Sequence, residues 1–424
     1  MRGLVSLVSM LSTDVLVVGA GPAGTAAAIE LRRQGRDVIV IDKATFPRDK
    51  CCGDGLTTDC LRQLEELGLH PGDVPNWNAV TDVVIYNPRG REVRLPLPDG
   101  GQYAAVVPRF DLDQSMVELA ASNGADIRDG VAFRAIEDHG DHLVVRTSGD
   151  PIACRYVIAA DGMWSPVRKH LGLDQPGYRG EWHAFRQYFS GVGPAAQHLV
   201  VWFEPDLLPG YAWSFPLPGQ RANVGFGIHR SSGVKVGDMG RIWTDLLERP
   251  TVQAVLGPDA EPEERHKAWP IPARVDGLAR TAHRVFFVGD AVAATDPMTG
   301  EGIAQALVSG RIAADAIDRA GATQPEAAAA AYERAVDHHL TTDHRFARFL
   351  AKLLEHPVGA RGALRAADTN DWTRRNFARW MFEDYPRAAI LTPSRWHRGM
   401  FTGPGAFRDD IVDLDDVDRA DSPV

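Results

Sequence analysis

Three glycines near the start of the chain have the spacing of a dinucleotide-binding turn. Gly19, Gly21 and Gly24 follow the pattern GxGxxG, and Asp42 comes eighteen residues after the last of them. Such a turn lets backbone amides approach a pyrophosphate, and an acid at this distance accepts hydrogen bonds from ribose hydroxyls. The spacing therefore predicts a dinucleotide cofactor without a 2'-phosphate. The alternative interpretation is a glycine-rich turn with a structural role only.

The segments around these glycines have the patterns of a strand, a helix and a second strand. Residues 15–18 and 38–41 are short apolar runs typical of buried parallel strands, and the Ala-rich segment 25–33 is typical of a helix. Pro22 suits the first turn of that helix. The pyrophosphate is then expected at the helix N-terminus, where free N–H groups attract an anion.

A loop that follows the second predicted strand contains a reactive side chain. Residues 48–55 include the cations Arg48 and Lys50 together with Cys52 and Gly53. We interpret this segment as a loop beside the cofactor, with its cations near the pyrophosphate. The alternative is an ordinary turn in which Cys52 packs as a small apolar side chain.

Three further polar residues stand where predicted elements begin or end. Arg109 precedes a helix predicted over 112–123 and is expected to reach back to the cofactor; a surface Arg beside a capping Asp is the alternative. Asp161 and Asp290 follow apolar runs typical of buried strands, and each has a glycine beside it. Two strand-end acids of this kind indicate an extended ligand.

A glycine-containing segment later in the chain favours a flavin over a nicotinamide. Residues 296–303 lead into a helix predicted over 302–319. The free N–H groups and the positive dipole end of that helix suit the pyrimidine edge of an isoalloxazine, which becomes anionic on reduction. Asp290 is expected to accept a hydrogen bond from a ribityl hydroxyl.

These motifs together resemble those of the flavoprotein monooxygenase and reductase superfamily over about residues 14–320. The resemblance implies FAD as the cofactor. The residues that it assigns to cofactor binding are Gly19, Gly21, Ala23, Gly24, Asp42, Lys43, Arg48, Cys52, Gly53, Arg109, Asp161, Gly162, Gly289, Asp290, Pro297, Gly300, Glu301, Gly302 and Ile303.

One element narrows the resemblance to the geranylgeranyl reductase family. Tyr211, Trp213 and Phe215 form a YxWxFP sequence that is followed by Gly225 and Gly227, which is similar to the signature of that family. The resemblance implies that these five residues line a long apolar substrate cavity. The alternative is an ordinary core strand, because alternating aromatic residues share one face of a sheet. Other aromatic residues that could extend the wall, or belong to the core, are Trp182, Phe185, Tyr188, Trp202 and Phe203.

The predicted fold is α/β: a Rossmann-like FAD-binding domain with an inserted antiparallel sheet and a helical C-terminal region. Antiparallel strands are expected within 82–97 and 102–107, a small sheet within 126–159, and further strands within 182–229. The predicted parts are an FAD-binding domain of residues 1–80, 104–175 and 275–322, a substrate domain of 81–103 and 176–274, and a helical region of 323–424 with an acidic tail at 409–421.

Composition restricts the partners and the compartment. The 424 residues have a formal net charge of −10, which argues against nucleic acid. The four cysteines form no CxxC pair, so a reducing cytoplasm is expected. No apolar stretch reaches the roughly 18 residues of a membrane span, and we expect at most peripheral membrane contact. No metal site is expected; a solvated helix is favoured for His338, His339, Asp343 and His344.

The leading hypothesis is an FAD-dependent reductase of carbon–carbon double bonds in a prenyl chain or a related hydrophobic molecule. Hydride is expected from N5 of the reduced flavin, and an acid must protonate the alkene, for which Cys52 or a water on its loop is the candidate. The electrons are expected from NADPH, NADH or a protein donor. The alternatives are an FAD monooxygenase, a flavin-dependent halogenase, which is disfavoured because a GWxWxIP motif is lacking, and a non-catalytic flavin or prenyl carrier.

Overall fold

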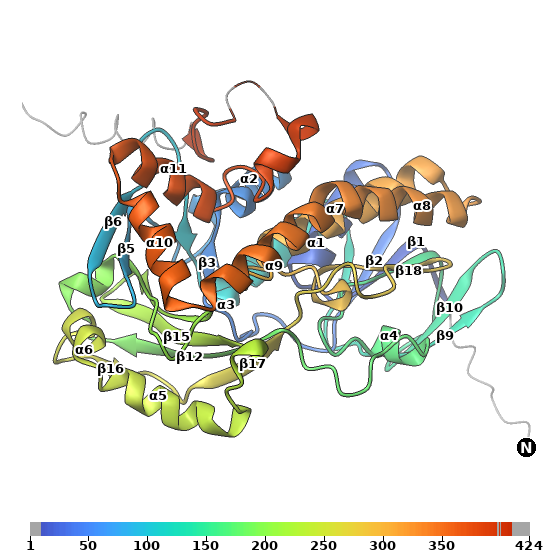
Figure 1. Cartoon of the computed structure of the whole chain (residues 1–424). Helices are drawn as coiled ribbons and strands as arrows, with labels where there is room; N and C mark the ends of the chain where they lie inside the picture. Colours follow the sequence, from blue (N-terminus) through green and yellow to red (C-terminus); the bar gives the residue numbers. More distant parts are fainter. Residues whose placement is uncertain (1–9, 397, 399, 409–424) are drawn as a thin grey trace, which may run out of the picture.

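The computed structural model describes residues 10–396, 398 and 400–408 (Figure 1). The strands of its first sheet are β1 (Leu11–Val18), β2 (Val38–Ile41), β8 (Asp126–Arg128), β9 (Phe133–Asp138), β10 (Leu143–Thr147), β11 (Ile152–Ala159), β18 (Thr281–Ala282) and β19 (Val285–Phe287). Their order is β18-β19-β11-β1-β2-β8, and the β9–β10 hairpin continues from β11. The strand, helix and strand predicted around the glycine turn are confirmed as β1, α1 (Pro22–Arg33) and β2.

The strands predicted within 126–159 are present, and they form part of the first sheet itself, not a small sheet that returns to it. β11 lies in the middle of the first sheet, between β1 and β19, and pairs with both in parallel. β8 pairs in parallel with β2, so it also belongs to this sheet. The last four residues of β11, 156–159, are all buried, as expected of a parallel strand that is covered on both faces.

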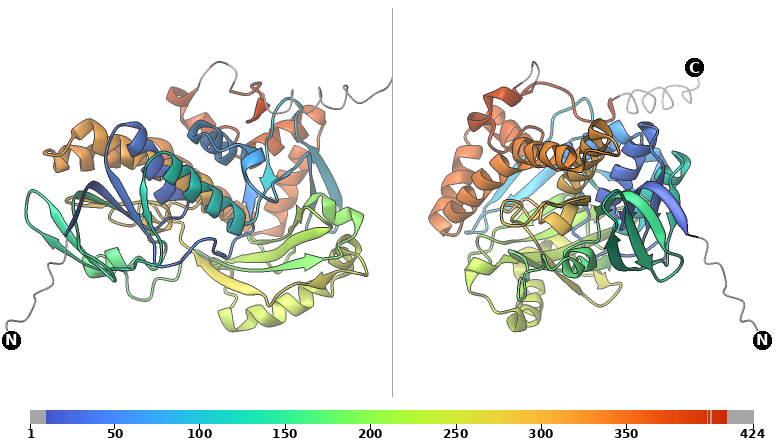
Figure 2. Two further views of the ribbon diagram at one scale, coloured as in Figure 1. Left: turned by 180° about the vertical axis from the view of Figure 1, so that it is seen from behind. Right: turned by 90° about the vertical axis from the view of Figure 1, so that its right-hand side faces the viewer.

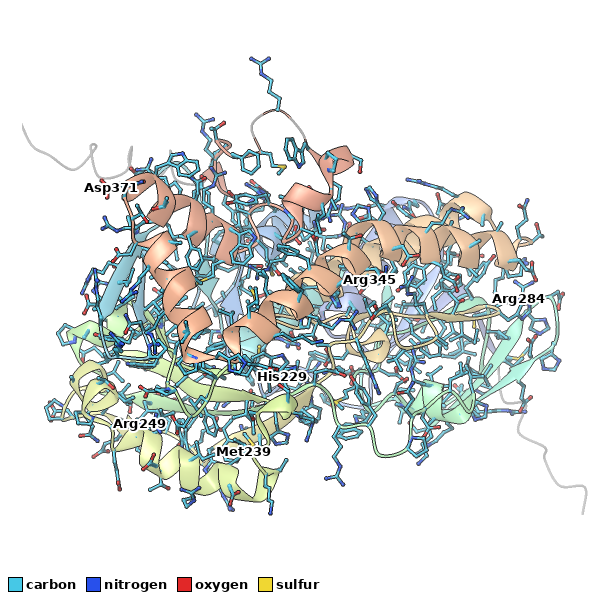
Figure 3. All side chains as sticks on the ribbon, in the orientation of Figure 1. His229, Met239, Arg249, Arg284, Arg345 and Asp371 are labelled. Carbon is cyan, nitrogen blue, oxygen red and sulfur yellow. The ribbon has the colours of Figure 1, made fainter. Side chains whose placement is uncertain are left out.

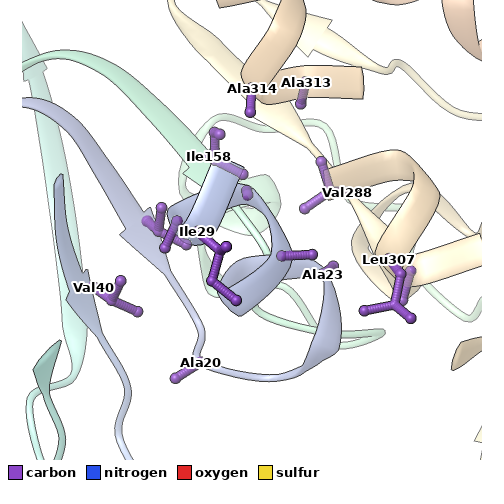
Figure 4. Close-up of a cluster of buried hydrophobic side chains, with 14 of the residues drawn as sticks. Ala20, Ala23, Ile29, Val40, Ile158, Val288, Leu307, Ala313 and Ala314 are labelled. Carbon is purple, nitrogen blue, oxygen red and sulfur yellow. The ribbon is translucent and has the colours of Figure 1, made fainter. Parts of the chain in front are cut away.

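Helices cover the first sheet and join it to the rest of the molecule. α1 packs against α7 (Ile303–Ala320) and α3 (Arg109–Ser122), and α2 (Thr58–Leu67) also contacts α7. α3 begins at Arg109, three residues before the start predicted for it. Figure 4 shows the core between these elements, to which Ala23, Ile29, Ile158 and Leu307 contribute.

A second sheet carries the aromatic strands. Its strands are β5 (Asp82–Tyr86), β6 (Glu92–Pro96), β12 (Trp182–Ser190), β13 (Leu199–Trp202), β14 (Tyr211–Leu217), β15 (Arg221–His229), β16 (Glu261–Pro262) and β17 (Lys267–Ile271). The order is β16-β12-β15-β14-β13-β5-β6, with β17 also paired to β12. One face packs against α5 (Met239–Leu247) and α6 (Pro250–Leu256), and Figures 1 and 2 show the C-terminal helices on the opposite face.

The strand predicted over 102–107 is much shorter in the structure. Only Ala105–Val106 (β7) pairs, in a small sheet with β3 (Gly55–Leu56) and β4 (Asn78–Ala79). The preceding Gly100 and Gly101 have φ of 89° and 116°, which no strand allows. The short helix α4 (Pro166–His170) follows β11.

The C-terminal region is helical, as predicted. It consists of α8 (Pro325–Val336), α9 (Thr342–Leu354), α10 (Pro357–Ala367) and α11 (Asp371–Met381). Among the residues that the structure describes, no helix is long and apolar enough to cross a membrane. The acidic tail predicted at 409–421 lies outside the described residues, and the bounds of the three predicted domains stay predictions.

Candidate functional site

A cavity of about 1860 Å³ is lined by residues of both sheets and by α7, α9, α10 and α11. Ordinary ligand pockets measure roughly 300–1,000 Å³, so this cavity has room for more than one ligand. The cofactor residues predicted from the sequence line one end of it, except for Gly24 and Pro297. Gly24 lies beneath the glycine turn, where an added Cβ would contact the Gly19 backbone, and the Pro297 carbonyl accepts the Trp182 indole N–H at 2.9 Å.

The glycine turn leaves its backbone open to the cavity. Gly19 has a φ of 107°, and a Cβ there would lie 2.7 Å from the Ala160 carbonyl carbon. Gly21 is the N-cap of α1, and no capping side chain covers the helix end. The Asp42 carboxylate accepts the Ala20 and Ala44 N–H groups, each at 2.8 Å, which leaves acceptor capacity for ribose hydroxyls.

Asp161 has an unused acceptor in the cavity wall. Its Oδ2 accepts the Val167 N–H at 2.9 Å, but its buried Oδ1 has no partner among the described residues. Burial raises the pKa of this carboxyl to about 6. A buried carboxylate oxygen without a donor favours a ligand that brings a hydroxyl or amide N–H to it. This orphaned oxygen, the open glycine turn and Asp42 fit the adenosine and pyrophosphate parts of FAD.

Two cations face a single buried acid near the same end. Arg109 Nε and Nη2 donate to the two oxygens of Asp113 at 2.7 and 2.8 Å, and Arg48 Nη1 lies 3.1 Å from the same carboxylate. Arg109 lines the cavity, and Asp113 holds its side chain there; its predicted contact with the cofactor stays a prediction. One carboxylate between two guanidinium groups leaves a net positive charge, which suits a pyrophosphate. Asp290, 4.0 Å from Lys50 Nζ, also lines the cavity.

The N-terminus of α7 differs from the prediction. Glu301 Oε1 accepts the Ile303 and Ala304 N–H groups at 2.9 and 3.3 Å, so these donors are not free. The sequence suggested several free amides here, whereas Glu301 occupies two of the first donors of this helix. The difference arises because Glu301 is long enough to cap its own helix.

The Cys52 loop rests on a polar network that the sequence did not reveal. The Cys52 thiol accepts the Asp54 N–H at 3.4 Å, and burial raises the pKa of that thiol to about 11. Asp54 is fully buried, and its Oδ2 accepts the Tyr188 hydroxyl at 2.6 Å and the Asn223 amide at 2.7 Å. Burial raises the pKa of Asp54 to about 6.

Asn223 joins this loop to the aromatic strand. Its Nδ2 also donates to the Cys52 carbonyl at 2.9 Å, and its Oδ1 accepts the Trp213 indole N–H at 3.1 Å. Tyr188 and Asn223 lie on neighbouring strands, β12 and β15, where they are register partners. A polar residue within an aromatic strand was the available signal for Asn223, but its partners are far away in the sequence.

Tyr211, Trp213 and Phe215 line the cavity together with Gly227. Gly225 does not line it; it is the register partner of Trp213, whose ring covers it. The aromatic wall begins beside the Cys52 loop, because a Cβ at Gly53 would contact both Trp213 and Phe215. Of the other aromatic residues considered, Trp182 and Phe203 line the cavity, whereas Phe185 and Trp202 pack in the core against α5 and α6 and Tyr188 binds Asp54.

The far end of the cavity is closed by helices in which the sequence showed no motif. Its wall there is largely apolar and consists of side chains from α9, α10 and α11, among them Leu350, Leu353, Ala363, Phe377 and Trp380. The histidines considered for a metal are not assembled into a site: His344 contacts the Ala294 carbonyl at 2.7 Å. The described residues contain no group of three or more His, Cys, Asp or Glu that could hold a metal ion.

Comparison with known proteins identifies the family. Residues 12–309 match the model of the FAD-binding domain. A menaquinone reductase of Mycobacterium tuberculosis is 35% identical over 339 residues, which cover 72% of this chain and 77% of that protein. Digeranylgeranylglycerophospholipid reductase 2 of Methanopyrus kandleri is 33% identical over 312 residues, covering 71% of this chain and 76% of that protein. The chain belongs to the geranylgeranyl reductase family of FAD-dependent oxidoreductases.

A solved structure of another protein has a similar fold. The geranylgeranyl bacteriochlorophyll reductase-like protein of Thermoplasma acidophilum has a TM-score of 0.76 at 22% identity and covers 91% of this chain and all of that one. This likeness concerns the fold, and it confirms the predicted α/β architecture with its antiparallel sheet. The FAD-binding match confirms the predicted cofactor.

Proposed function

We propose that this protein reduces carbon–carbon double bonds in a prenyl chain or a related hydrophobic molecule. The observation that carries the proposal is the continuity of the cavity. Its aromatic wall at Trp213 and Phe215 starts at the Cys52 loop, and apolar helices line the far end. A long apolar chain therefore has a place from the cofactor end to α9–α11. The names of the two curated relatives, both reductases, support the same reaction class.

FAD, when bound in its reduced form, supplies the hydride, and the residues of this chain supply the rest. An isolated alkene is a poor hydride acceptor, so the wall must also deliver a proton. We propose Cys52 as the catalytic acid. Because burial raises the pKa of its thiol to about 11, the thiol keeps its proton at neutral pH. The residues predicted for FAD binding and the aromatic residues predicted for substrate binding are proposed for those roles.

The electron donor is proposed to be NADPH or NADH that binds transiently. The sequence has one GxGxxG turn, at Gly19–Gly24, and we assign this turn to FAD. A nicotinamide would then bind without a Rossmann turn of its own. A purified, FAD-loaded protein whose flavin is bleached by NADPH supports this assignment, and a protein bleached only by dithionite contradicts it.

Peripheral contact with a lipid bilayer belongs to the same proposal. Four apolar side chains at the α9–α11 helices form what we call the rim surface: Phe349, Leu353, Val358 and Trp372, with exposed fractions of 57, 50, 71 and 72%. Leu353 and Trp372 also line the cavity, so the rim surface lies at its edge. Figure 3 labels Arg345 on α9 and Asp371 at the start of α11, which mark these helices.

The charges near the rim surface support an anionic bilayer. Four cations on the same helices have no ion-pair partner in the described part of the chain: Lys352, Arg361, Arg365 and Arg375. Exposed apolar side chains flanked by cations are the pattern of an interfacial helix on anionic lipid. A prenyl substrate could then enter the cavity from the bilayer without crossing water.

Anaerobic turnover tests the reaction. The FAD-loaded protein is reduced by dithionite, mixed with geranylgeranyl diphosphate without oxygen, and the products are analysed by mass spectrometry. We expect products that gain two hydrogens for each reduced bond. Strict dependence on oxygen would instead indicate a monooxygenase, and dependence on halide a halogenase. A mixture that forms no product and in which the flavin stays reduced would indicate a carrier.

A further inference from the structure

A second cavity lies behind the first turns of α7. It measures about 580 Å³ and has a largely charged and polar wall, which includes Asp296, Gln305, His339, Asp343, Glu383 and Arg387. Neighbouring residues face different cavities: Glu301 lines the main cavity, whereas Gln305, four residues later, lines the second. In the same way, Phe382 lines the main cavity and Glu383 the second. The wall between the cavities is therefore one layer of side chains.

Hydrogen bonds cross this layer. Gln305 Nε2 donates to Glu383 Oε1 at 3.0 Å, and Glu383 Oε2 accepts the Thr57 hydroxyl at 3.2 Å. Gln305 Oε1 is buried and has no partner among the described residues. Glu301 lies just before this helix and caps its first turn by accepting the Ile303 and Ala304 N–H groups. The Gln305 amide therefore binds Glu383 and keeps one free acceptor at the turn that Glu301 caps.

The backbone at Glu383 indicates that its side chain matters. Glu383 follows the C-cap of α11 and has a φ of 58°. Glycine is usual at this left-handed position, because a Cβ causes strain there. Glu383 is held there by Gln305, Thr57 and Arg387, whose Nη2 lies 3.3 Å from its carboxylate. A glycine would relieve the strain but would remove these contacts.

The charges in the layer do not balance without protons. Asp296 Oδ1 accepts the Met298 and Thr299 N–H groups, and its other oxygen lies 3.6 Å from Arg387 Nε. Arg387 thus forms ion pairs with both Asp296 and Glu383. The carboxyl group of Glu301 acts on the same two acids as a third negative charge. Like charges so close cannot all be ionised in a buried site, so the group retains a proton near neutral pH.

The pKa values of Glu301 and Glu383 agree with a retained proton. Burial, together with the charge of Asp296, raises the pKa of Glu301 to about 7, and burial raises the pKa of Glu383. The charge of Glu301 also acts on Cys52. The other titratable or charged groups that act on Glu301, Glu383 or their neighbours are Asp59, Cys60, Arg109 and Tyr211. The second cavity is also lined by His338, His339, Asp343 and His344.

We propose that Glu383 and Glu301 carry protons from the second cavity to Cys52, with Gln305 holding the path between them. The inference rests on the proposed function, in which each reduced double bond takes one hydride from reduced FAD and one proton from Cys52. The S–H bond breaks as the new C–H bond forms, and the thiolate takes the Glu301 proton. Glu383 then reprotonates Glu301 and is reloaded by water from the second cavity.

The direction of transfer follows from the relative acidities. A thiolate whose conjugate acid has a pKa of about 11 is a much stronger base than the Glu301 carboxylate. Proton transfer from Glu301 to Cys52 is therefore downhill. Both glutamates act through Cys52 and not on the substrate itself.

Two variants and a control test the relay. E301Q keeps an oxygen for the Ile303 and Ala304 N–H groups but holds no transferable proton. E383A removes a carboxyl from the second cavity and leaves space for a small acid, and E383Q is its backup if folding fails. E66Q is the control, because Glu66 lines the second cavity but is paired with Arg311 outside the proposed path.

The assay is anaerobic turnover of reduced, FAD-loaded protein with geranylgeranyl diphosphate, a substrate with several double bonds. In E301Q we expect the first bond to be reduced at close to the wild-type rate, because Cys52 starts protonated. The later bonds should be about a hundredfold slower. E383A should show the same pattern, and millimolar acetate should restore its later steps. E66Q should behave as wild type.

A second readout uses the apoprotein. The folded-state pKa of Glu301, about 7, is above its ordinary value of 4.5, so the stability it contributes at low pH is lost as pH rises from 4.5 through 7. Urea unfolding of E301Q should lack that decline. The relay is overturned if E301Q and E383A reduce all bonds at wild-type rates. It is also overturned if both variants reduce every bond equally slowly and acetate does not restore the rate of E383A. A wild-type protein that forms no reduced product overturns the proposed function instead.

Discussion

Replacing Gly225 by alanine should deform the aromatic wall and leave the glycine turn and Asp42, which are proposed to hold the adenosine end of FAD, in place. A Cβ at this position would lie 2.7 Å from Trp213 Cε2, and closer still to Trp213 Cζ2 and the Phe185 carbonyl oxygen. Ordinary carbon contacts are about 3.5–4.0 Å, so the indole must move by roughly 1 Å. The Phe185 carbonyl belongs to the paired strand and cannot move away without breaking the sheet.

The expected cost follows from this overlap. Inserting a methyl group into a closely packed site destabilises a protein by about 1–3 kcal/mol, and displacement of Trp213 also weakens its 3.1 Å hydrogen bond to Asn223. We expect the free energy of unfolding of G225A, measured with urea, to fall below that of the wild type by an amount near the upper end of that range. The flavin content should remain at the wild-type level, while KM for the prenyl substrate rises.

Gly237→Ala is the matched control. Gly237 has no heavy atom within 4 Å of an added Cβ, and its φ is not in the left-handed region. This variant should keep wild-type stability and wild-type KM. If G225A unfolds at the same urea concentration as G237A, or if its flavin content falls with its stability, the assignment of Gly225 as the residue that admits the Trp213 ring is wrong.

Three further variants address the cofactor end, the acid and the rim surface. D161N should lower the affinity for FAD, measured by fluorescence titration. The raised pKa of Asp161, about 6, also means that the stability it contributes is lost as pH rises from 3.8 through 6. The free energy of unfolding of apo D161N, measured with urea, should therefore change less with pH over that range than that of the wild type. C52S should retain bound flavin but lose turnover by about a hundredfold or more, and full anaerobic turnover would rule out the thiol as the acid. W372A should bind phosphatidylglycerol vesicles more weakly in co-sedimentation, whereas F110A, at a residue 46% exposed on α3, should not; equal binding of the two contradicts the rim surface.

The sequence predicted the strand, helix and strand around the glycine turn correctly because this signal is local. Gly19, Gly21 and Asp42 belong to one strand–helix–strand unit, and their spacing alone determines where they meet. The central position of β11 was missed for the opposite reason. A strand order depends on pairing between distant segments, and the antiparallel hairpin before β11 suggested a small sheet that only returns to the first domain.

The polar groups behind the site could not be predicted for a related reason. Asp54 meets Tyr188 and Asn223 across 134 and 169 residues of sequence, and no spacing rule connects them. Glu383 meets Gln305 across 78 residues, from a segment without any motif. Glu301 was assigned to the cofactor by resemblance, but its capping of Ile303 and Ala304 depends on a rotamer that the sequence does not specify.

Asn223 has a consequence for how this enzyme can evolve. Its one amide group binds the indole of Trp213, the carbonyl of Cys52 and the carboxylate of Asp54. A mutation that widens the cavity by shifting the indole therefore also shifts the loop that bears the thiol. In the proposed mechanism, chain-length selectivity and proton donation are therefore coupled, and a variant selected for a bulkier substrate needs a compensating change at the Asn223 position to recover its acid geometry.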